Sequence, residues 1–248
     1  MMRAVRAAIL ALLASAAPAW AVECREISVD SIGYTICTVD LDTEELRLFL
    51  NDENGALYGQ FGAIQRDLQN GGKQLGFAMN AGMYHDDRDP VGYYVEDGKE
   101  VMRVIPNPGP GNFGLLPNGI LCIRQGRADV FETLRFLEQA PACTYATQSG
   151  PMLVIDGALH PRFLPDSASR NIRNGVGTSA DGKTAIFAIS ESPVTFYEFG
   201  RLYRDYLKLP NALFLDGNIS RLYAPDLNRR DIGFSLGPIV GTVEPLTR

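Results

Sequence analysis

Residues 212–218 read Ala-Leu-Phe-Leu-Asp-Gly-Asn, a short apolar run that ends in an acidic residue and a turn. The same pattern occurs twice earlier, where Phe77-Ala78-Met79 leads into Asn80-Ala81-Gly82 and Met152–Ile155 leads into Asp156-Gly157. Apolar runs of this length between turn residues are typical of buried strands, although an Asp-Gly pair alone is more typical of a simple turn. Rigid scaffolds present catalytic side chains at the ends of their strands. The three runs therefore predict a β-sheet core and a candidate site.

Further strands and helices are expected before, between and after these runs. Apolar residues at helical spacing predict helices over 57–68, 134–137 and 196–207. The other expected strands are 33–39 and 46–50 as one hairpin, 92–95 and 100–105 as a second, 119–124 and 128–131 as a third, and 175–178 and 185–189. Few strand–helix–strand crossovers occur, which favours an α+β class over a doubly wound sheet. We expect a single α+β domain with a mixed, largely antiparallel β-sheet core and about three helices.

The first 21 residues have the features of a signal peptide. Arg3 and Arg6 precede an uncharged apolar run, and Ala19-Trp20-Ala21 supplies small residues for cleavage after Ala21. An N-terminal anchor is the alternative, but the apolar run is shorter than the roughly 20 residues that span a bilayer. We therefore expect a signal peptide over 1–21, one domain over 22–248, a periplasmic or secreted location and no stable membrane insertion.

The four cysteines allow three disulfide pairings. We favour Cys24 with Cys37 and Cys122 with Cys143, because each pair closes a local loop between predicted strands or turns. Disulfides persist in the oxidising compartment that a signal peptide implies. A metal site is the alternative, but the spacings are irregular and contain no Cys-x-x-Cys.

Composition and missing motifs narrow the functional classes. A net charge of −6 argues against a nucleic-acid binder, because such proteins neutralise phosphates with a basic surface. The chain has no nucleophile elbow, no phosphate-binding P-loop and no zinc-protease helix motif. We expect no cofactor and no metal; Asp86, Asp87 and Asp89 lack the full pattern of an EF-hand loop. Ser149 is a possible nucleophile, but a turn residue is the simpler interpretation.

Two arginines and two amides lie beside glycines over 170–177. A guanidinium group matches phosphate or carboxylate oxygens with paired hydrogen bonds, so this segment is a candidate anion site. A solvated loop with surface ion pairs is the alternative interpretation.

Taken together and in order, these motifs resemble the phosphodiester glycosidase family. The resemblance covers residues 76–241 and is closer to bacterial secreted members than to the animal enzyme. It rests on Ala78–Tyr84 (AMNAGMY), Pro90–Gly92 with Asp97-Gly98, Ser149–Gly157 (SGPMLVIDG), Arg173–Gly177 (RNGVG) and Ala212–Gly217 (ALFLDG). It implies hydrolysis of a sugar 1-phosphodiester. Many members have Asp-Gly-Gly-Gly-Ser where this chain has Asp216-Gly217-Asn218-Ile219-Ser220, so the family's sugar specificity is not carried over.

For such a substrate, glycosidic cleavage needs a carboxylate at the sugar and charge stabilisation at the phosphate. Asp216 is the candidate nucleophile or base, and Arg173 the candidate phosphate ligand, with Arg170 as a helper. Glu191 and Asp156 are possible second carboxylates. His85 is a candidate acid–base group or, equally, a hydrated loop histidine. The expected substrate-binding residues are Asn80, Gly82, Ser149, Gly150, Asp156, Arg170, Asn174, Gly217 and Asn218.

Two other functions stay open at this stage. A phosphodiesterase would cut the same substrate at phosphorus and release a sugar phosphate. A non-catalytic glycan-binding protein of the cell envelope is favoured by Asn218 and Ile219, whose side chains occupy space that glycines leave open in many members. The expected ligand in every case is a sugar phosphate or an envelope glycan.

Overall fold

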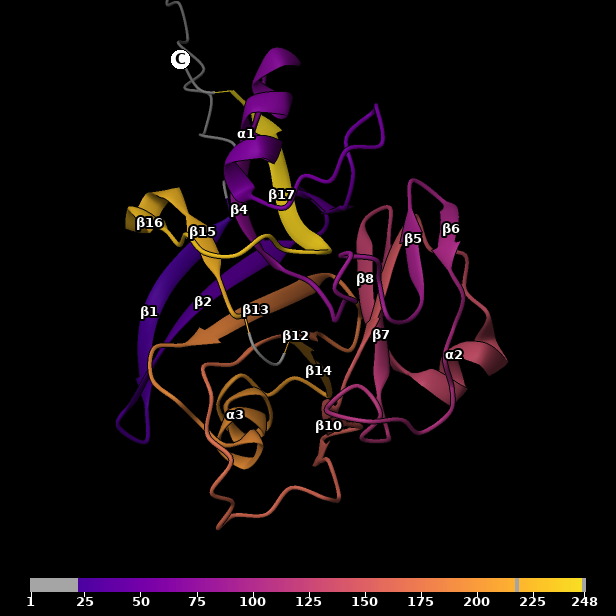
Figure 1. The fold of residues 1–248 in the computed structure, drawn as a ribbon. Helices are drawn as coiled ribbons and strands as arrows, with labels where there is room; N and C mark the ends of the chain where they lie inside the picture. The colour runs from indigo at the N-terminus through magenta and orange to yellow at the C-terminus, as the bar shows by residue number, and fades with distance from the viewer. Residues whose placement is uncertain (1–21, 217–218, 247–248) are drawn as a thin grey trace, which may run out of the picture.

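The computed structural model describes residues 22–216 and 219–246, and it shows three antiparallel sheets with three α-helices (Figure 1). The α+β class is confirmed. Every pair of hydrogen-bonded strands in the described chain is antiparallel, a simpler arrangement than the mixed, largely antiparallel sheet that we expected. The predicted signal peptide lies outside the described residues.

The largest sheet has seven strands in the order β1-β2-β13-β12-β14-β10-β11. Its strands are β1 (Glu23–Val29), β2 (Ile32–Asp40), β13 (Thr184–Ser190), β12 (Asn174–Thr178), β14 (Asn211–Asp216), β10 (Met152–Ile155) and β11 (Ala158–Leu159). Two of the three apolar runs that predict the core, those of β10 and β14, pair within this sheet.

Two five-stranded sheets pack against this sheet. One runs β16 (Arg229–Arg230), β15 (Leu222–Ala224), β4 (Lys73–Asn80), β17 (Ile239–Pro245) and β3 (Glu45–Phe49). The other runs β6 (Lys99–Met102), β5 (Tyr94–Glu96), β9 (Tyr145–Ser149), β7 (Gly119–Arg124) and β8 (Arg127–Glu132). The main core lies where all three meet: Phe77 of β4 packs on Phe187 of β13 with ring centroids 4.9 Å apart, beside Leu121 of β7.

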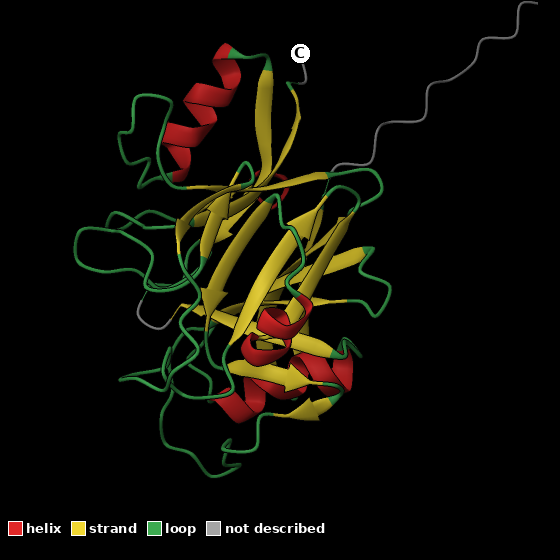
Figure 2. Cartoon of the chain, turned by 90° about the vertical axis from the view of Figure 1, so that its right-hand side faces the viewer, coloured by secondary structure: helices red, strands yellow, loops and turns green. Residues whose placement is uncertain are grey.

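The helices cover the outer faces of the sheets (Figure 2). α1 (Phe61–Asn70) packs on β4 through Phe61 and Ile64, and α2 (Thr133–Gln139) follows β8. α3 (Phe196–Arg201) packs on the seven-stranded sheet and continues as one π-helical segment over Leu202–Tyr206. In the described part of the chain, no helix is long and apolar enough to cross a membrane.

One expected hairpin is wrong. Strand 33–39 lies in β2, which pairs with β1 and β13, whereas strand 46–50 lies in β3, which pairs with β17 in another sheet. The acidic turn between them connects two sheets. The true partner, β1, was missed because its side chains are mostly exposed or half-buried and polar. Asp30 and Ser31, with φ of 50° and 65°, form the tight turn that joins β1 to β2.

The other local expectations are confirmed. β5 pairs with β6 and β7 pairs with β8, each across a turn with a glycine at positive φ, Gly98 and Gly126. The third helix begins after Thr195, whose hydroxyl accepts the Glu198 N–H while the Glu198 carboxylate accepts the Thr195 N–H. The first helix begins at Phe61, four residues later than Leu57, and ends before Gly71.

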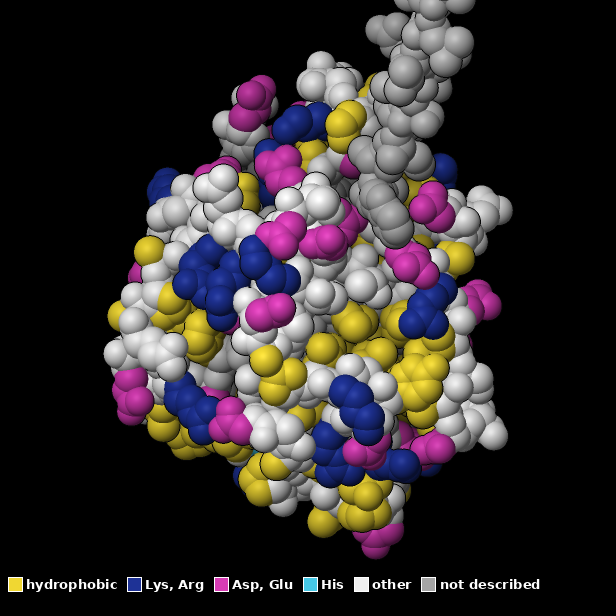
Figure 3. All heavy atoms as spheres, turned by 180° about the vertical axis from the view of Figure 1, so that it is seen from behind, with side chains coloured by type: hydrophobic (Ala, Val, Ile, Leu, Met, Phe, Trp, Pro, Cys, Tyr) yellow, Lys and Arg dark blue, Asp and Glu magenta, His cyan; other side chains and the backbone are white. Residues whose placement is uncertain are grey.

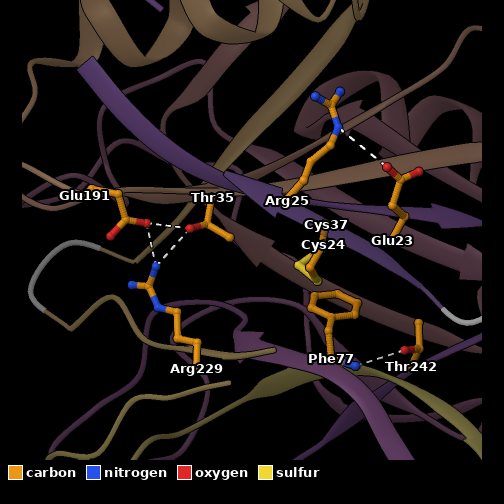
Figure 4. The surroundings of a disulfide bond; sticks show 9 residues. All are labelled: Glu23, Cys24, Arg25, Thr35, Cys37, Phe77, Glu191, Arg229 and Thr242. Atoms are coloured by element: carbon orange, nitrogen blue, oxygen red, sulfur yellow. Dashed lines mark hydrogen bonds and ion pairs between the residues drawn. A yellow bond between two sulfur atoms is a disulfide. The ribbon is translucent and has the colours of Figure 1, made fainter. Parts of the chain in front are cut away.

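Both favoured disulfides are present, Cys24–Cys37 and Cys122–Cys143. The first joins directly opposed residues of β1 and β2 beside Phe77 (Figure 4). The second joins β7 to the residues before β9 and encloses β8 and α2. Disulfides of this kind persist in oxidising compartments.

Loss of the second disulfide is expected to destabilise the fold strongly. Replacing Cys122 and Cys143 with alanine should lower the free energy of unfolding by about 3 kcal/mol, because a closed loop of this length restricts the unfolded chain. Equilibrium urea unfolding without reductant measures the effect, and the unreduced wild-type chain is the reference. An unchanged urea midpoint would contradict the expectation.

Candidate functional site

Three strand ends meet at a buried cluster of polar side chains. β4 ends at Asn80, and Asn174 at the start of β12 pairs with Asp216 at the end of β14. The Asn80 Nδ2 donates to the Asp216 Oδ2 at 3.2 Å, and the Asn174 Nδ2 donates to the Asn80 carbonyl oxygen at 2.9 Å. Asn80 and Asn174 are fully buried, and Asp216 is 7% exposed. The cluster therefore joins two sheets around one carboxylate.

Local irregularity of the sheet brings this carboxylate to the cluster. The register between β12 and β14 shifts after Asn174, so Gly175 faces Phe214 and one residue of β14 is left over. Such a bulge re-aims a side chain and is common beside functional sites. Ser149 secures the same place, since its hydroxyl donates to the Leu215 carbonyl oxygen at 2.8 Å. Ser149 is thus engaged in holding β14, not paired with a base.

The chain after β14 returns to the same cluster. The Ser220 hydroxyl lies 3.1 Å from the Ile172 carbonyl oxygen and 3.4 Å from the Asn174 Oδ1. The Arg221 backbone N–H donates to the Asn80 Oδ1 at 2.8 Å. Asn80 therefore uses its amide oxygen for Arg221 and its amide nitrogen for Asp216, which fixes the position of both residues. Gly217 and Asn218, expected to bind substrate, lie outside the described residues.

Several buried donors on Tyr84, Arg88 and Arg221 lack acceptors in the described chain. They are the Tyr84 hydroxyl, the Arg88 Nε, and the Nε and Nη2 of Arg221. Burial raises the pKa of Tyr84, and the negative charge of Asp216 raises it further, while Arg88 and Arg221 lower it. The charges of Asp216, Arg88 and Arg221 therefore all act on the Tyr84 hydroxyl. Buried donors are normally paired, so unpaired ones are suited to an anionic or hydroxyl-rich ligand.

Arg173 lies on the other face of the sheet. Its neighbour Asn174 faces Asn80, and successive side chains of a strand point to opposite faces. The Arg173 guanidinium stacks 3.6 Å from the ring centroid of Phe196, and its Nε donates to the Val194 carbonyl oxygen at 2.9 Å. It is fully buried, and burial lowers its pKa to about 10. Arg173 therefore anchors the chain before β12 onto α3, and its Nη1 is a buried donor without an acceptor in the described chain.

The expected second carboxylates lie apart from the cluster. Glu191 follows β13 and accepts hydrogen bonds from Thr35 and Arg229, two strand positions away from Asp216 in the sheet (Figure 4). Asp156 sits in an exposed turn at the opposite end of β14, where it pairs with Arg135. The structure thus places neither residue beside Asp216. Glu191 is separated from it by the order of the strands, and Asp156 lies at the other end of β14.

The remaining candidates occupy surface or packing positions. His85 is exposed in the turn that precedes Arg88, and Arg170 is exposed and pairs with Glu198. Gly82, at φ 142°, permits close packing, since a Cβ there would lie 2.6 Å from the Thr147 Oγ1. A Cβ on Gly150 would lie 2.6 Å from the Asn118 Cβ. In the described chain, no three His, Cys, Asp or Glu side chains gather as metal ligands.

A pocket of about 350 Å³ opens next to the cluster. It is lined by Asn171, Ile172, Ile219, Ser220, Arg221, Ile232, Gly233 and Phe234. Ser220 and Arg221 belong both to this pocket and to the hydrogen-bond network of Asn80 and Asn174. Space for a ligand is therefore available directly beside the buried polar groups.

The sequence model of the phosphodiester glycosidase family matches residues 73–236, a segment that contains Asn80, Asn174, Asp216 and Arg221. The chain belongs to the phosphodiester glycosidase family. It is 34% identical over 191 residues to the uncharacterized protein YigE of Escherichia coli K12, an alignment that covers 75% of this chain and 72% of that protein.

Two solved structures share the fold of this chain. The catalytic domain of zebrafish N-acetylglucosamine-1-phosphodiester alpha-N-acetylglucosaminidase, auto-inhibited by its pro-peptide, matches with a TM-score of 0.60 at 13% identity, over 89% of this chain and 81% of that one. A putative exported protein of Burkholderia pseudomallei matches with a TM-score of 0.50 at 11% identity, over 85% and 74%.

Three residues of this candidate site were not predicted as ligand contacts. Ser220 and Arg221 follow the Asp216 turn, but no apolar strand precedes them to mark a strand end. Tyr84 was named only as the last residue of the Ala78–Tyr84 motif. A signal for Arg221 existed in the sequence: a cation within a few residues of the candidate carboxylate.

Proposed function

We propose that this protein is an exported hydrolase that cleaves the glycosidic bond of a sugar 1-phosphodiester. The observation that carries the proposal is the carboxylate of Asp216, held by Asn80 at the meeting point of β4, β12 and β14 in a member of the phosphodiester glycosidase family. The two disulfides and the expected signal peptide support export to the periplasm or beyond the cell.

The cluster supplies the groups that glycosidic cleavage requires. The bond between the sugar C1 and the phosphate oxygen breaks, and its electron pair leaves with the phosphate, which departs as a phosphomonoester of the aglycone. Water supplies the oxygen that C1 gains. Asp216 either attacks C1 first, to be displaced by water, or takes the proton from the attacking water. Because phosphate is already a fair leaving group, charge stabilisation matters more here than a strong acid.

The amides of Asn80 and Asn174 orient this carboxylate. One Asn80 Nδ2 hydrogen bond to Asp216 fixes the carboxylate plane, and the Asn174 side chain in turn bonds the Asn80 backbone. Because the amide nitrogens and oxygens are mutually satisfied and buried, the carboxylate is held before substrate arrives. Pre-positioning of this kind reduces the reorganisation needed in the transition state.

An isotope experiment tests the reaction. The purified mature chain is incubated with a panel of sugar 1-phosphodiesters, including nucleotide sugars, in H₂¹⁸O, and mass spectrometry locates the label. We expect the label in the free sugar. Label in the phosphate would show cleavage at phosphorus and would overturn the proposal. A chain that binds these compounds without any turnover would instead support the glycan-binding alternative.

A further inference from the structure

Arg221 is a buried cation that forms no close ion pair within the described chain, where Asp231 acts on its charge from farther away. Its side chain is 4% exposed, and no ion pair to it occurs among the described residues. Its Nη1 donates to the Gln60 Oε1 at 3.1 Å, and its guanidinium lies 5.3 Å from the ring centroid of Phe61. The Nε and Nη2 remain without acceptors. A buried guanidinium in this condition destabilises the fold unless an anion reaches it.

The surroundings of Arg221 direct that anion to one side. Gln60 and Gly233 cover part of the side chain, since Gln60 also donates to the Gly233 carbonyl oxygen at 3.1 Å and a Cβ on Gly233 would lie 3.3 Å from the Arg221 Cδ. The Tyr84 hydroxyl is a further buried donor without an acceptor in the described chain, and its pKa is raised by burial and by Asp216 and lowered by Arg88 and Arg221. The remaining approach is the pocket that Arg221 helps to line. Two N–H groups in a planar fork suit phosphate oxygens.

The rest of the same pocket is apolar. Ile172 and Ile219 form its walls, and Ile232 and Phe234 stand at its rim. Ile232 is 91% exposed and Phe234 is 78% exposed, the two highest values among the large hydrophobic side chains of the described chain. The face seen from behind shows basic and acidic side chains interspersed with apolar ones (Figure 3). Large apolar side chains gathered at a pocket with one charged group are typical of a ligand site.

We propose that Arg221, assisted by Tyr84, binds the phosphate of the substrate, and that Ile172, Ile219, Ile232 and Phe234 bind an apolar aglycone attached to it. The substrate class is then a sugar 1-phosphodiester whose alcohol is alkyl, isoprenoid or aromatic. This inference rests on the proposed glycosidic cleavage. The order of groups agrees with it: Asp216 would face the sugar, Arg221 the phosphate, and the Ile232–Phe234 rim the aglycone beyond.

The test uses the phosphomonoesters that glycosidic cleavage would release. Isothermal titration calorimetry compares methyl phosphate with hexyl phosphate on the purified mature chain. We expect hexyl phosphate to bind at least about tenfold more tightly, because its extra methylenes leave water for the pocket. The double variant Ile232→Ser, Phe234→Ser should lower the affinity for hexyl phosphate to that for methyl phosphate. The affinity for methyl phosphate should not change. Arg221→Gln should weaken both esters by about tenfold or more, since charge-assisted contacts are lost.

Matched controls separate the pocket from general effects. Val101→Ser removes an exposed apolar side chain on β6, and Arg204→Gln removes an arginine that is paired with Asp205. Both should leave the preference for hexyl phosphate unchanged, and thermal melts establish that each variant is folded. Equal affinities of the wild-type chain for the two esters would overturn the inference. So would a preference that survives the rim variant. Ester binding needs no turnover, so failure of hydrolysis in labelled water is a separate result.

Discussion

Replacing Asp216 with asparagine is expected to lower kcat/KM for a sugar 1-phosphodiester by about 10³-fold or more, with the fold retained. Asparagine has the shape of aspartate and keeps an oxygen that can accept the Asn80 Nδ2 hydrogen bond. It cannot, however, take a proton from water at neutral pH, and it is a poor nucleophile. The loss should appear in kcat, because the carboxylate acts on the reacting carbon and not on remote binding groups.

The control for this variant is Asp156→Asn. Asp156 also follows an apolar strand and begins an Asp-Gly turn. It lies, however, near the opposite end of β14, in an exposed ion pair with Arg135. Its loss should change kcat/KM by less than about twofold, since exposed ion pairs contribute little. Initial rates and circular dichroism are measured for both variants. Comparable losses in the two, or an active Asp216→Asn, would remove Asp216 from the proposed mechanism.

The contrast between Asp216 and Asp156 also shows how much of the candidate site can be predicted from the sequence. Both acids end an apolar strand, so the local pattern is the same for each. Only the pairing of β12 with β14 and the meeting of β14 with β4 bring Asp216 next to Asn80. The β12–β14 pairing joins Asn174 to Asp216, 42 positions apart, and the contact of Asn80 with Asp216 spans 136 positions. No local periodicity encodes such contacts.

Arg173 shows a second limit, which is direction. The residue that follows it, Asn174, hydrogen-bonds to Asn80 in the candidate site. A strand turns adjacent side chains to opposite faces, however, so a shift of one residue moves a side chain from the site to the packing layer under α3. Sequence alone did not fix which of the two neighbours faces Asp216. The second and third hairpins could be predicted from their turns. The partner of β2 was missed.

The strongest pH effect is expected from Asn80→Asp. The substitution keeps the shape of the side chain and an oxygen for the Arg221 N–H, but it places a second carboxylate at about 3 Å from Asp216, where the Asn80 Nδ2 now lies. Two carboxylates at this distance cannot both ionise easily, and the pair retains a proton to higher pH. Since the proposed reaction needs Asp216 ionised, the acid limb of the kcat/KM profile should move up by about one to three pH units.

The direction of this shift is the informative result. At a pH on the old limb, kcat/KM should fall by more than about tenfold, and it should recover as the pH rises through the new limb. Asn80→Ala provides the comparison, because it removes the hydrogen bond to Asp216 without adding charge. It should lower kcat/KM and move the limb up by less than Asn80→Asp does, because a lost hydrogen bond raises the pKa of a carboxyl less than a second carboxylate does. Thermal melts across the same pH range show whether each variant is folded where its rate is measured. An unmoved limb in Asn80→Asp would mean that the ionisation of Asp216 does not control the rate, and that its carboxylate has a role other than nucleophile or base.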